Sequence, residues 1–114
     1  MREGVFKNNM FVQANLFTWT QHVKMKIRFY GLSESRVKRV IRHPDRIEEG
    51  VAPFTVACMQ KAGTLKNPQE IWSMYQTKTK NQVRVISAWR YPGVSPKKNP
   101  IPQDILDEIL GLLE

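Results

Sequence analysis

The residues with the clearest chemical potential lie in the segment QVRVISAWRYPGVSP, residues 82 to 96. Its first half alternates as a strand does, and regular alternation puts Arg84 and Arg90 on one face, because successive strand side chains point to opposite faces. Tyr91 follows, and a Pro-Gly pair ends the strand. Half-buried arginines need partners, and the planar fork of a guanidinium matches a phosphate well. The segment therefore predicts a phosphate-binding pair, Arg84 and Arg90, with Tyr91 beside it.

Two lysines, Lys78 and Lys80, precede this strand in the short connection KTKN. If the flanking strands pair antiparallel, both lysines lie at one end of the Arg84 strand, while Arg90 and Tyr91 lie at the other. Lysines crowded by other cations have lowered pKa values and can act as bases. A charged hairpin tip beside an exposed sheet face explains the same pattern without a ligand. Charge alone does not distinguish this structural interpretation from the functional one.

A histidine and a lysine fall on the apolar side of the first expected helix. His22 and Lys26 are four residues apart, which makes them neighbours on the helix surface. One interpretation is a hydrogen-bonded core histidine with a lysine that reaches to solvent. The other is a cleft at the sheet edge, where the cation lowers the pKa of His22 and keeps the imidazole neutral. The apolar arc that surrounds them consists of Trp19, Val23, Met25, Ile27, Phe29 and Tyr30.

The charge is distributed unevenly along the 114 residues. All 18 basic residues and six of the ten acidic residues lie in residues 1–100, whereas residues 101–114 hold the other four acidic residues and no basic residue. A basic body favours a surface for a polyanion, and an acidic end favours a segment that covers part of that surface. A charge that serves solubility, with a solvated acidic helix, fits the same counts.

Composition narrows the class of protein. An apolar share of 41% and an aromatic share of 10% are typical of a globular domain. The single cysteine excludes an intramolecular disulfide, and no Cys/His cluster has the spacing of zinc ligands. Neither a membrane-spanning stretch nor a secretion signal is evident. We therefore expect a cytoplasmic protein that uses no metal or other cofactor and does not associate with membranes.

Hydrophobic periodicity predicts the elements that must position these residues. Thr18 is expected to cap the first helix and Gly31 to end it. The order of elements predicts one α+β domain over residues 1–114, with two helices followed by an antiparallel sheet and a last amphipathic helix. The expected ranges are 1–17 (an extension or edge strand), helices at 18–30 and 33–43, strands at 54–60, 70–77 and 82–91, a proline-rich connection at 93–102 and a helix at 103–113.

The segment FTWTQHVKMKIRFYGLSESRVKRVIRHPDRIEEG, residues 17 to 50, resembles the start of a domain family related to the RelE and BrnT toxins. The shared pattern is a Thr-x-His at a helix start, a Gly-hydrophobic-Ser turn, a Val-rich helix and a proline before the sheet. The strand VRVISAWR also looks like a late strand of that family. The resemblance covers residues 17 to 92 and rests mainly on Thr20, His22, Gly31, Leu32, Ser33, Val37, Val40 and Pro44.

This resemblance implies a two-layer RelE-like fold, in which the N-terminal helices pack on a small antiparallel sheet. It also implies cleavage of RNA, since several relatives are toxin ribonucleases neutralised by an antitoxin. The expected partners are RNA, free or bound to a ribosome, and an acidic antitoxin protein. Scission by the RNA 2′-hydroxyl needs a base, cations around the phosphorus and an acid. We expect His22 or Lys78 as the base, Arg84 and Arg90 as stabilisers, and Tyr91 to stack a nucleobase. Lys26, Arg28 and Lys80 are expected to bind the RNA backbone.

Two other functions use the same basic residues. One is a non-catalytic module that binds RNA or a ribosome, and the other is an interaction domain for an acidic protein. Binding and catalysis draw on the same cations, so the sequence does not separate the toxin from the binding module. It also gives no indication of the oligomeric state.

Overall fold

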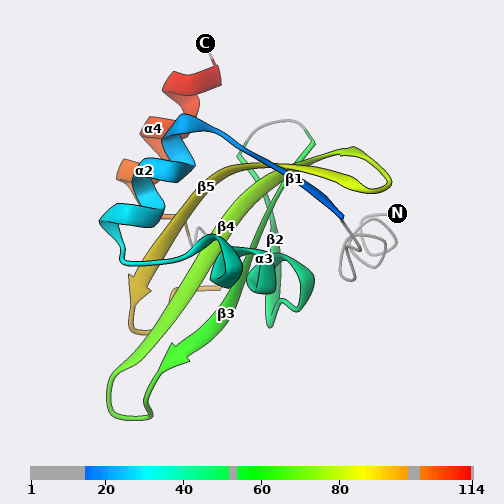
Figure 1. Ribbon diagram of the computed structural model, residues 1–114. Coiled ribbons are helices and arrows are strands. Elements are labelled where there is room, and N and C mark those ends of the chain that lie inside the picture. Colours follow the sequence, from blue (N-terminus) through cyan, green and yellow to red (C-terminus); the bar gives the residue numbers. More distant parts are fainter. Residues whose placement is uncertain (1–14, 52–53, 98–100, 114) are drawn as a thin grey trace.

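The computed structural model describes residues 15–51, 54–97 and 101–113 (Figure 1). No helix in these ranges is long and apolar enough to cross a membrane. The elements are β1 (Leu16–Trp19), α2 (Gln21–Phe29), α3 (Glu34–Arg42), β2 (Arg46–Glu49), β3 (Thr55–Gly63), β4 (Pro68–Thr79), β5 (Gln82–Pro92) and α4 (Gln103–Leu113).

The five strands form one mixed sheet in the order β1-β5-β4-β3-β2. The three predicted strands are confirmed as the antiparallel neighbours β3, β4 and β5. Two further strands extend the sheet: β2 pairs antiparallel with β3, and β1 pairs parallel with β5. The expectation of a purely antiparallel sheet is therefore wrong at the β1 edge. β1 begins at Leu16, within the range 1–17 that was predicted as an extension or edge strand. Residues 1–14 of that range lie outside the described residues.

The N-cap of the first helix lies two residues later than predicted, because Thr18 belongs to β1 and pairs with Arg84. Thr20 is the N-cap: its hydroxyl accepts a hydrogen bond from the Val23 amide at 3.1 Å and donates one to a β5 carbonyl at 3.0 Å. Gly31, at φ +65°, ends the helix as expected. Thr20 thus fixes the start of α2 against β5.

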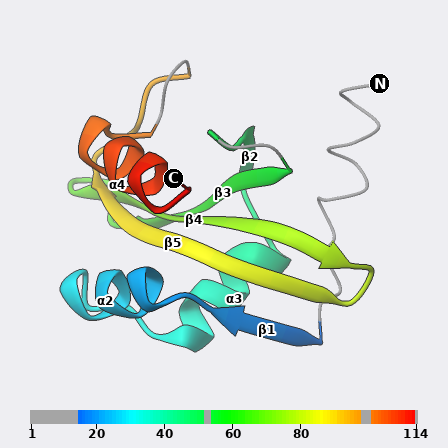
Figure 2. The same cartoon turned by 90° about the horizontal axis from the view of Figure 1, so that it is seen from above.

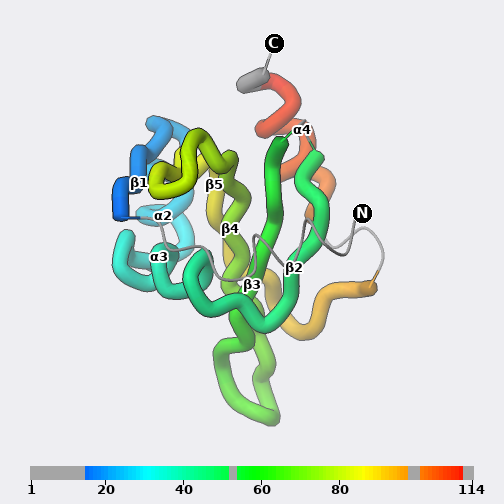
Figure 3. The backbone as a smooth tube through the Cα atoms, turned by 90° about the vertical axis from the view of Figure 1, so that its right-hand side faces the viewer, coloured from blue at the N-terminus to red at the C-terminus, as the bar shows by residue number. Residues whose placement is uncertain are grey.

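The helices cover both faces of the sheet. The buried side chains of α2 and α3 pack with one set of strand residues, and those of α4 pack with another. Figures 2 and 3 show α2 and α3 on one side of the sheet and α4 on the other. The α+β class is confirmed, but the expected two-layer arrangement is wrong, since α4 adds a third layer.

Two tryptophans form the core beneath α4. The rings of Trp72 on β4 and Trp89 on β5 stack with centroids 5.7 Å apart, and Ile105 and Ile109 of α4 cover them. Both isoleucines are fully buried, and burial of such side chains contributes roughly 2 kcal/mol each. The acidic helix is therefore an integral part of the fold.

The apolar arc of α2 is narrower than the helical wheel predicts. Val23 and Ile27 are buried against the sheet, whereas Met25 is 59% exposed and Phe29 is 77% exposed. A short helix at the sheet edge contacts the strands along a narrow stripe, which leaves its flanks in solvent.

Candidate nucleic-acid interface

A β-bulge in β5 places Arg84 and Arg90 on opposite faces of the sheet. The pairing of β5 with β4 passes over Ile86, and an unpaired residue inverts the alternation of side chains beyond it. Val85 and Ala88 consequently lie in the same core beneath α2 and α3, although they are three residues apart. Arg84 thus faces away from that core and Arg90 faces towards it. The expected shared face is wrong.

Arg90 is held by protein groups. Its guanidinium donates to the Tyr30 carbonyl from Nε at 3.3 Å and Nη2 at 3.0 Å, and to Gln69 Oε1 from Nη1 at 2.9 Å. These bonds satisfy a carbonyl at the end of α2, where a cation also interacts favourably with the helix dipole. Arg84 is exposed, and Tyr91 packs partly against the tryptophan core on the far face.

The predicted catalytic residues do not converge. Lys78 and Lys80 are exposed near the turn that joins β4 and β5. Arg84 and Arg90 are six residues apart on one strand, a separation of about 20 Å. His22 contacts the middle of the same strand. The basic and aromatic candidates therefore occupy the two ends of β5, and only His22 lies between them.

His22 joins three elements. Its Nε2 lies 3.1 Å from Ser87 Oγ on β5, and its Nδ1 lies 3.8 Å from Glu108 Oε2 on α4. Lys26, one turn further along α2, donates to Glu108 Oε1 at 2.8 Å. The side chains of His22 and Lys26 are only 10% and 16% exposed. The expected pair of a histidine and a cation is present, and the carboxylate of Glu108, which sequence analysis did not single out, contacts both.

Burial lowers the pKa of His22 below its ordinary value of 6.5. The charge of Glu108 acts in the opposite direction, and the charge of Lys26 adds a smaller lowering. The direction expected from the sequence is confirmed, although burial rather than the lysine is the main cause. The imidazole is therefore predominantly neutral at pH 7.

In space, His22 lies between the hydroxyl of Ser87 and the carboxylate of Glu108. The same serine, histidine and acid arrangement activates a serine nucleophile in acyl transfer. Ser87 is fully buried, however, and the contact of 3.8 Å between His22 and Glu108 is too long for a hydrogen bond. A substrate cannot reach the Ser87 hydroxyl in this arrangement. The contact serves to hold α2 against β5.

The lowered pKa of His22 predicts a loss of stability on acidification. Below pH 6.5 the unfolded chain takes up a proton that the folded chain excludes, so the free energy of unfolding falls until pH reaches the folded-state pKa. Urea denaturation at pH 7.5, 6.5 and 5.5 checks this for the parent protein and His22→Gln. The stability difference between the two proteins should change with pH. A constant difference would show that the imidazole is not held neutral.

The two faces of the molecule differ in charge. The helical layer of α2 and α3 contains seven basic residues and one acidic residue, Glu34, whereas α4 contains three acidic residues and no basic one. This polarity follows from the fold, because the two basic helices share one face of the sheet. The basic residues of the layer are Lys24, Lys26, Arg28, Arg36, Lys38, Arg39 and Arg42.

A shallow groove runs along the outer side of α3. Two of its basic groups are positioned by an aromatic ring: Lys38 Nζ and the Arg42 guanidinium lie 5.4 and 5.1 Å from the centroid of Phe17. Such contacts hold the ends of long basic side chains in place against an aromatic ring. The residues that line the groove are Ser35, Lys38, Arg39, Arg42 and His43.

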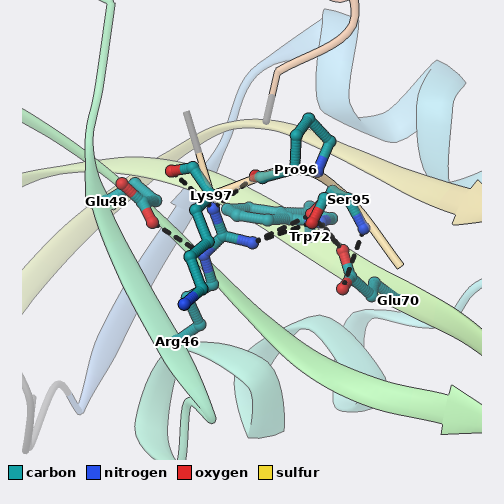
Figure 4. Close-up of polar contacts among 7 residues, drawn as sticks. All are labelled: Arg46, Glu48, Glu70, Trp72, Ser95, Pro96 and Lys97. Atoms are coloured by element: carbon teal, nitrogen blue, oxygen red, sulfur yellow. Dashed lines mark hydrogen bonds and ion pairs between the residues drawn. The ribbon is translucent and has the colours of Figure 1, made fainter. Parts of the chain in front are cut away.

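A buried glutamate ties the connection before α4 to the sheet (Figure 4). Glu70, 3% exposed, accepts hydrogen bonds from the Ser95 amide and hydroxyl and from Trp72 Nε1. Arg46 donates to Ser95 Oγ at 3.0 Å and to Glu48 at 2.7 Å, and its guanidinium lies 5.4 Å from the Trp72 ring centroid. These contacts are structural. The sequence signal for them is an acidic residue within an otherwise apolar strand.

Within the described ranges, no group of three or more His, Cys, Asp or Glu side chains could hold a metal ion. No protein-family model, curated protein or solved structure matches the chain.

Proposed function

We propose that this protein binds single-stranded RNA along the helical layer of α2 and α3. The observation that carries the proposal is the seven-to-one excess of basic residues in that layer, on the face opposite the acidic α4. RNA offers a regular row of phosphates that a strip of lysines and arginines neutralises with release of counterions. The exposed aromatic ring of Phe29 beside these cations offers a surface on which a nucleobase can stack.

A RelE-like fold is part of the same proposal. It is supported by the order of two helices followed by antiparallel strands and by the resemblance of residues 17–92 to that toxin family. The third layer formed by α4 is an addition to the expected arrangement. Fold alone does not determine activity, so the binding surface is the stronger support for the function.

Binding through phosphates predicts a steep dependence on salt. If six or more phosphates are neutralised, affinity should fall on the order of a thousandfold between 50 and 200 mM salt. Fluorescence anisotropy with a labelled single-stranded RNA measures this. A flat salt dependence, or no binding at low salt, contradicts the proposal. Binding of an acidic protein in place of RNA would support the interaction-domain alternative.

A second candidate function is RNA cleavage, as in a toxin-type endoribonuclease controlled by an acidic antitoxin. One observation favours it: the burial of His22 keeps its imidazole neutral beside the cation Lys26, as a general base requires. The carboxylate of Glu108 neutralises Lys26 and restricts access to His22. Labelled RNA incubated with the protein, with and without translating ribosomes, tests cleavage. Cleavage that is lost in His22→Gln while RNA affinity is kept assigns His22 as the base.

A further inference from the structure

A row of three residues crosses β3, β4 and β5 on the face that α2 and α3 cover. The register pairs Gln60 with Ile71 and Ile71 with Arg90. Neighbouring strands are about 4.8 Å apart, so the Cα atoms of Gln60 and Arg90 are separated by about 10 Å. Ile71 packs into the core under the helices. The two polar residues flank it, close to the end of α2 and the start of α3.

Two glutamine amides hold guanidinium groups at this position. Gln60 Oε1 accepts from Arg36 Nη1 at 2.9 Å, and Gln69 Oε1 accepts from Arg90 Nη1 at 2.9 Å. The amide nitrogen of Gln60 donates to two carbonyls at the C-terminal end of α3, which fixes the Gln60 side chain. A neutral amide orients a guanidinium without compensating its charge.

The charges of Arg39 and Arg90 both act on Arg36. Burial lowers the pKa of Arg36, and Arg39 and Arg90 lower it further, while Asp45 acts more weakly in the opposite direction. Among the described residues no carboxylate lies within ion-pair distance of these three arginines. Asp45 accepts a hydrogen bond from the Lys61 amide instead. An anion bound here would relieve the repulsion among the arginines.

We propose that Arg36, Arg39 and Arg90 form a subsite that binds one phosphate group. Arg36 on α3 lies close enough to Arg39 and to Arg90 on β5 for both charges to act on it, and a guanidinium fork matches the oxygens of a phosphate. The glutamine amides preorganise two of the forks, which limits the entropy lost on binding. The proposal deepens the RNA-binding function and rests on it for the source of the phosphate. Free pyrophosphate presents the same chemistry.

The test measures two affinities for each protein, one for a labelled single-stranded RNA and one for pyrophosphate. The variants are Arg36→Gln and Arg39→Gln, and Arg84→Gln is the matched control on the opposite face of the sheet. Loss of one charge-assisted contact should weaken both ligands about tenfold in the two subsite variants. The control should lose about threefold or less. Arg90 also donates hydrogen bonds to the Tyr30 carbonyl at the end of α2, so the change at this position is Arg90→Lys, which keeps the charge. Thermal denaturation verifies that each variant is folded.

The outcomes separate the subsite from the RNA-binding function. If the parent protein binds RNA and the subsite variants lose no more affinity than Arg84→Gln, the proposed phosphate subsite is contradicted, while the proposed RNA-binding function is not. If the parent protein binds pyrophosphate through Arg36 and Arg39 but does not bind RNA, the function is wrong and the subsite stands. Binding of neither ligand contradicts both.

Discussion

Replacement of Glu70 by alanine should lower the free energy of unfolding by about 3 kcal/mol, because three buried donors lose their acceptor. Those donors are the Trp72 indole and the amide and hydroxyl of Ser95. The loss also frees the connection that leads into α4, whose residue Ile105 lies on the tryptophan core. Urea denaturation followed by tryptophan fluorescence measures both the stability and the environment of Trp72.

Two further variants calibrate this effect. Glu70→Gln keeps one acceptor oxygen and should cost about half as much. Ser95→Ala removes a hydroxyl that donates to Glu70 and accepts from Arg46, and it should cost about 1 to 2 kcal/mol. The double variant Glu70→Ala/Ser95→Ala should lose less than the sum of the single losses, since both changes remove the same contact. Additive losses would contradict the role given to Glu70.

Reversal of charge on the helical layer should abolish RNA binding. The triple change Lys24→Glu, Arg28→Glu and Arg39→Glu replaces three exposed cations on α2 and α3. Each replacement removes a phosphate contact and adds repulsion, so affinity at 100 mM salt should fall on the order of a thousandfold. Anisotropy with the labelled RNA measures the loss, and thermal denaturation verifies that the variant folds.

A matched control separates local contact from net charge. Lys61, Lys66 and Lys97 are exposed lysines outside the helical layer, and their replacement by glutamate changes the net charge by the same amount. If RNA lies on α2 and α3, this control should lose about tenfold or less, through long-range attraction alone. Equal losses in the two triple variants would show that the protein attracts RNA by net charge without a defined face.

Periodicity predicted the elements well where tertiary contacts agree with local preference. The N-cap Ser33, the buried stripe Val37–Val40–Ile41 and the helix Gln103–Leu113 all follow from residue types and spacing. The start of α2 was misplaced, because β5 draws Thr18 into a strand pairing that only the folded sheet provides. The periodicity of residues 103–113 likewise shows which side of α4 is apolar, but it does not show which face of the sheet the helix covers.

The candidate site was predicted less well, for one local reason and one global reason. The bulge at Ile86 inverts the alternation of β5, and nothing in the run VRVISAWR marks the unpaired residue. The partners of Arg36 and Lys26, which are Gln60 and Glu108, come from elements 24 and 82 residues away. Charge counts did indicate a basic body with an acidic end, and Glu108 of that end pairs with Lys26 of the helical layer.

The most direct test of the central claim, that RNA lies on the α2 and α3 face, is an NMR titration of isotope-labelled protein with single-stranded RNA. The amide signals that shift should belong to residues 21–43 and to the neighbourhood of Arg90, with little change in residues 103–113. Shifts confined to α4 and the far face of the sheet, or none at a concentration where RNA is bound, would contradict the account.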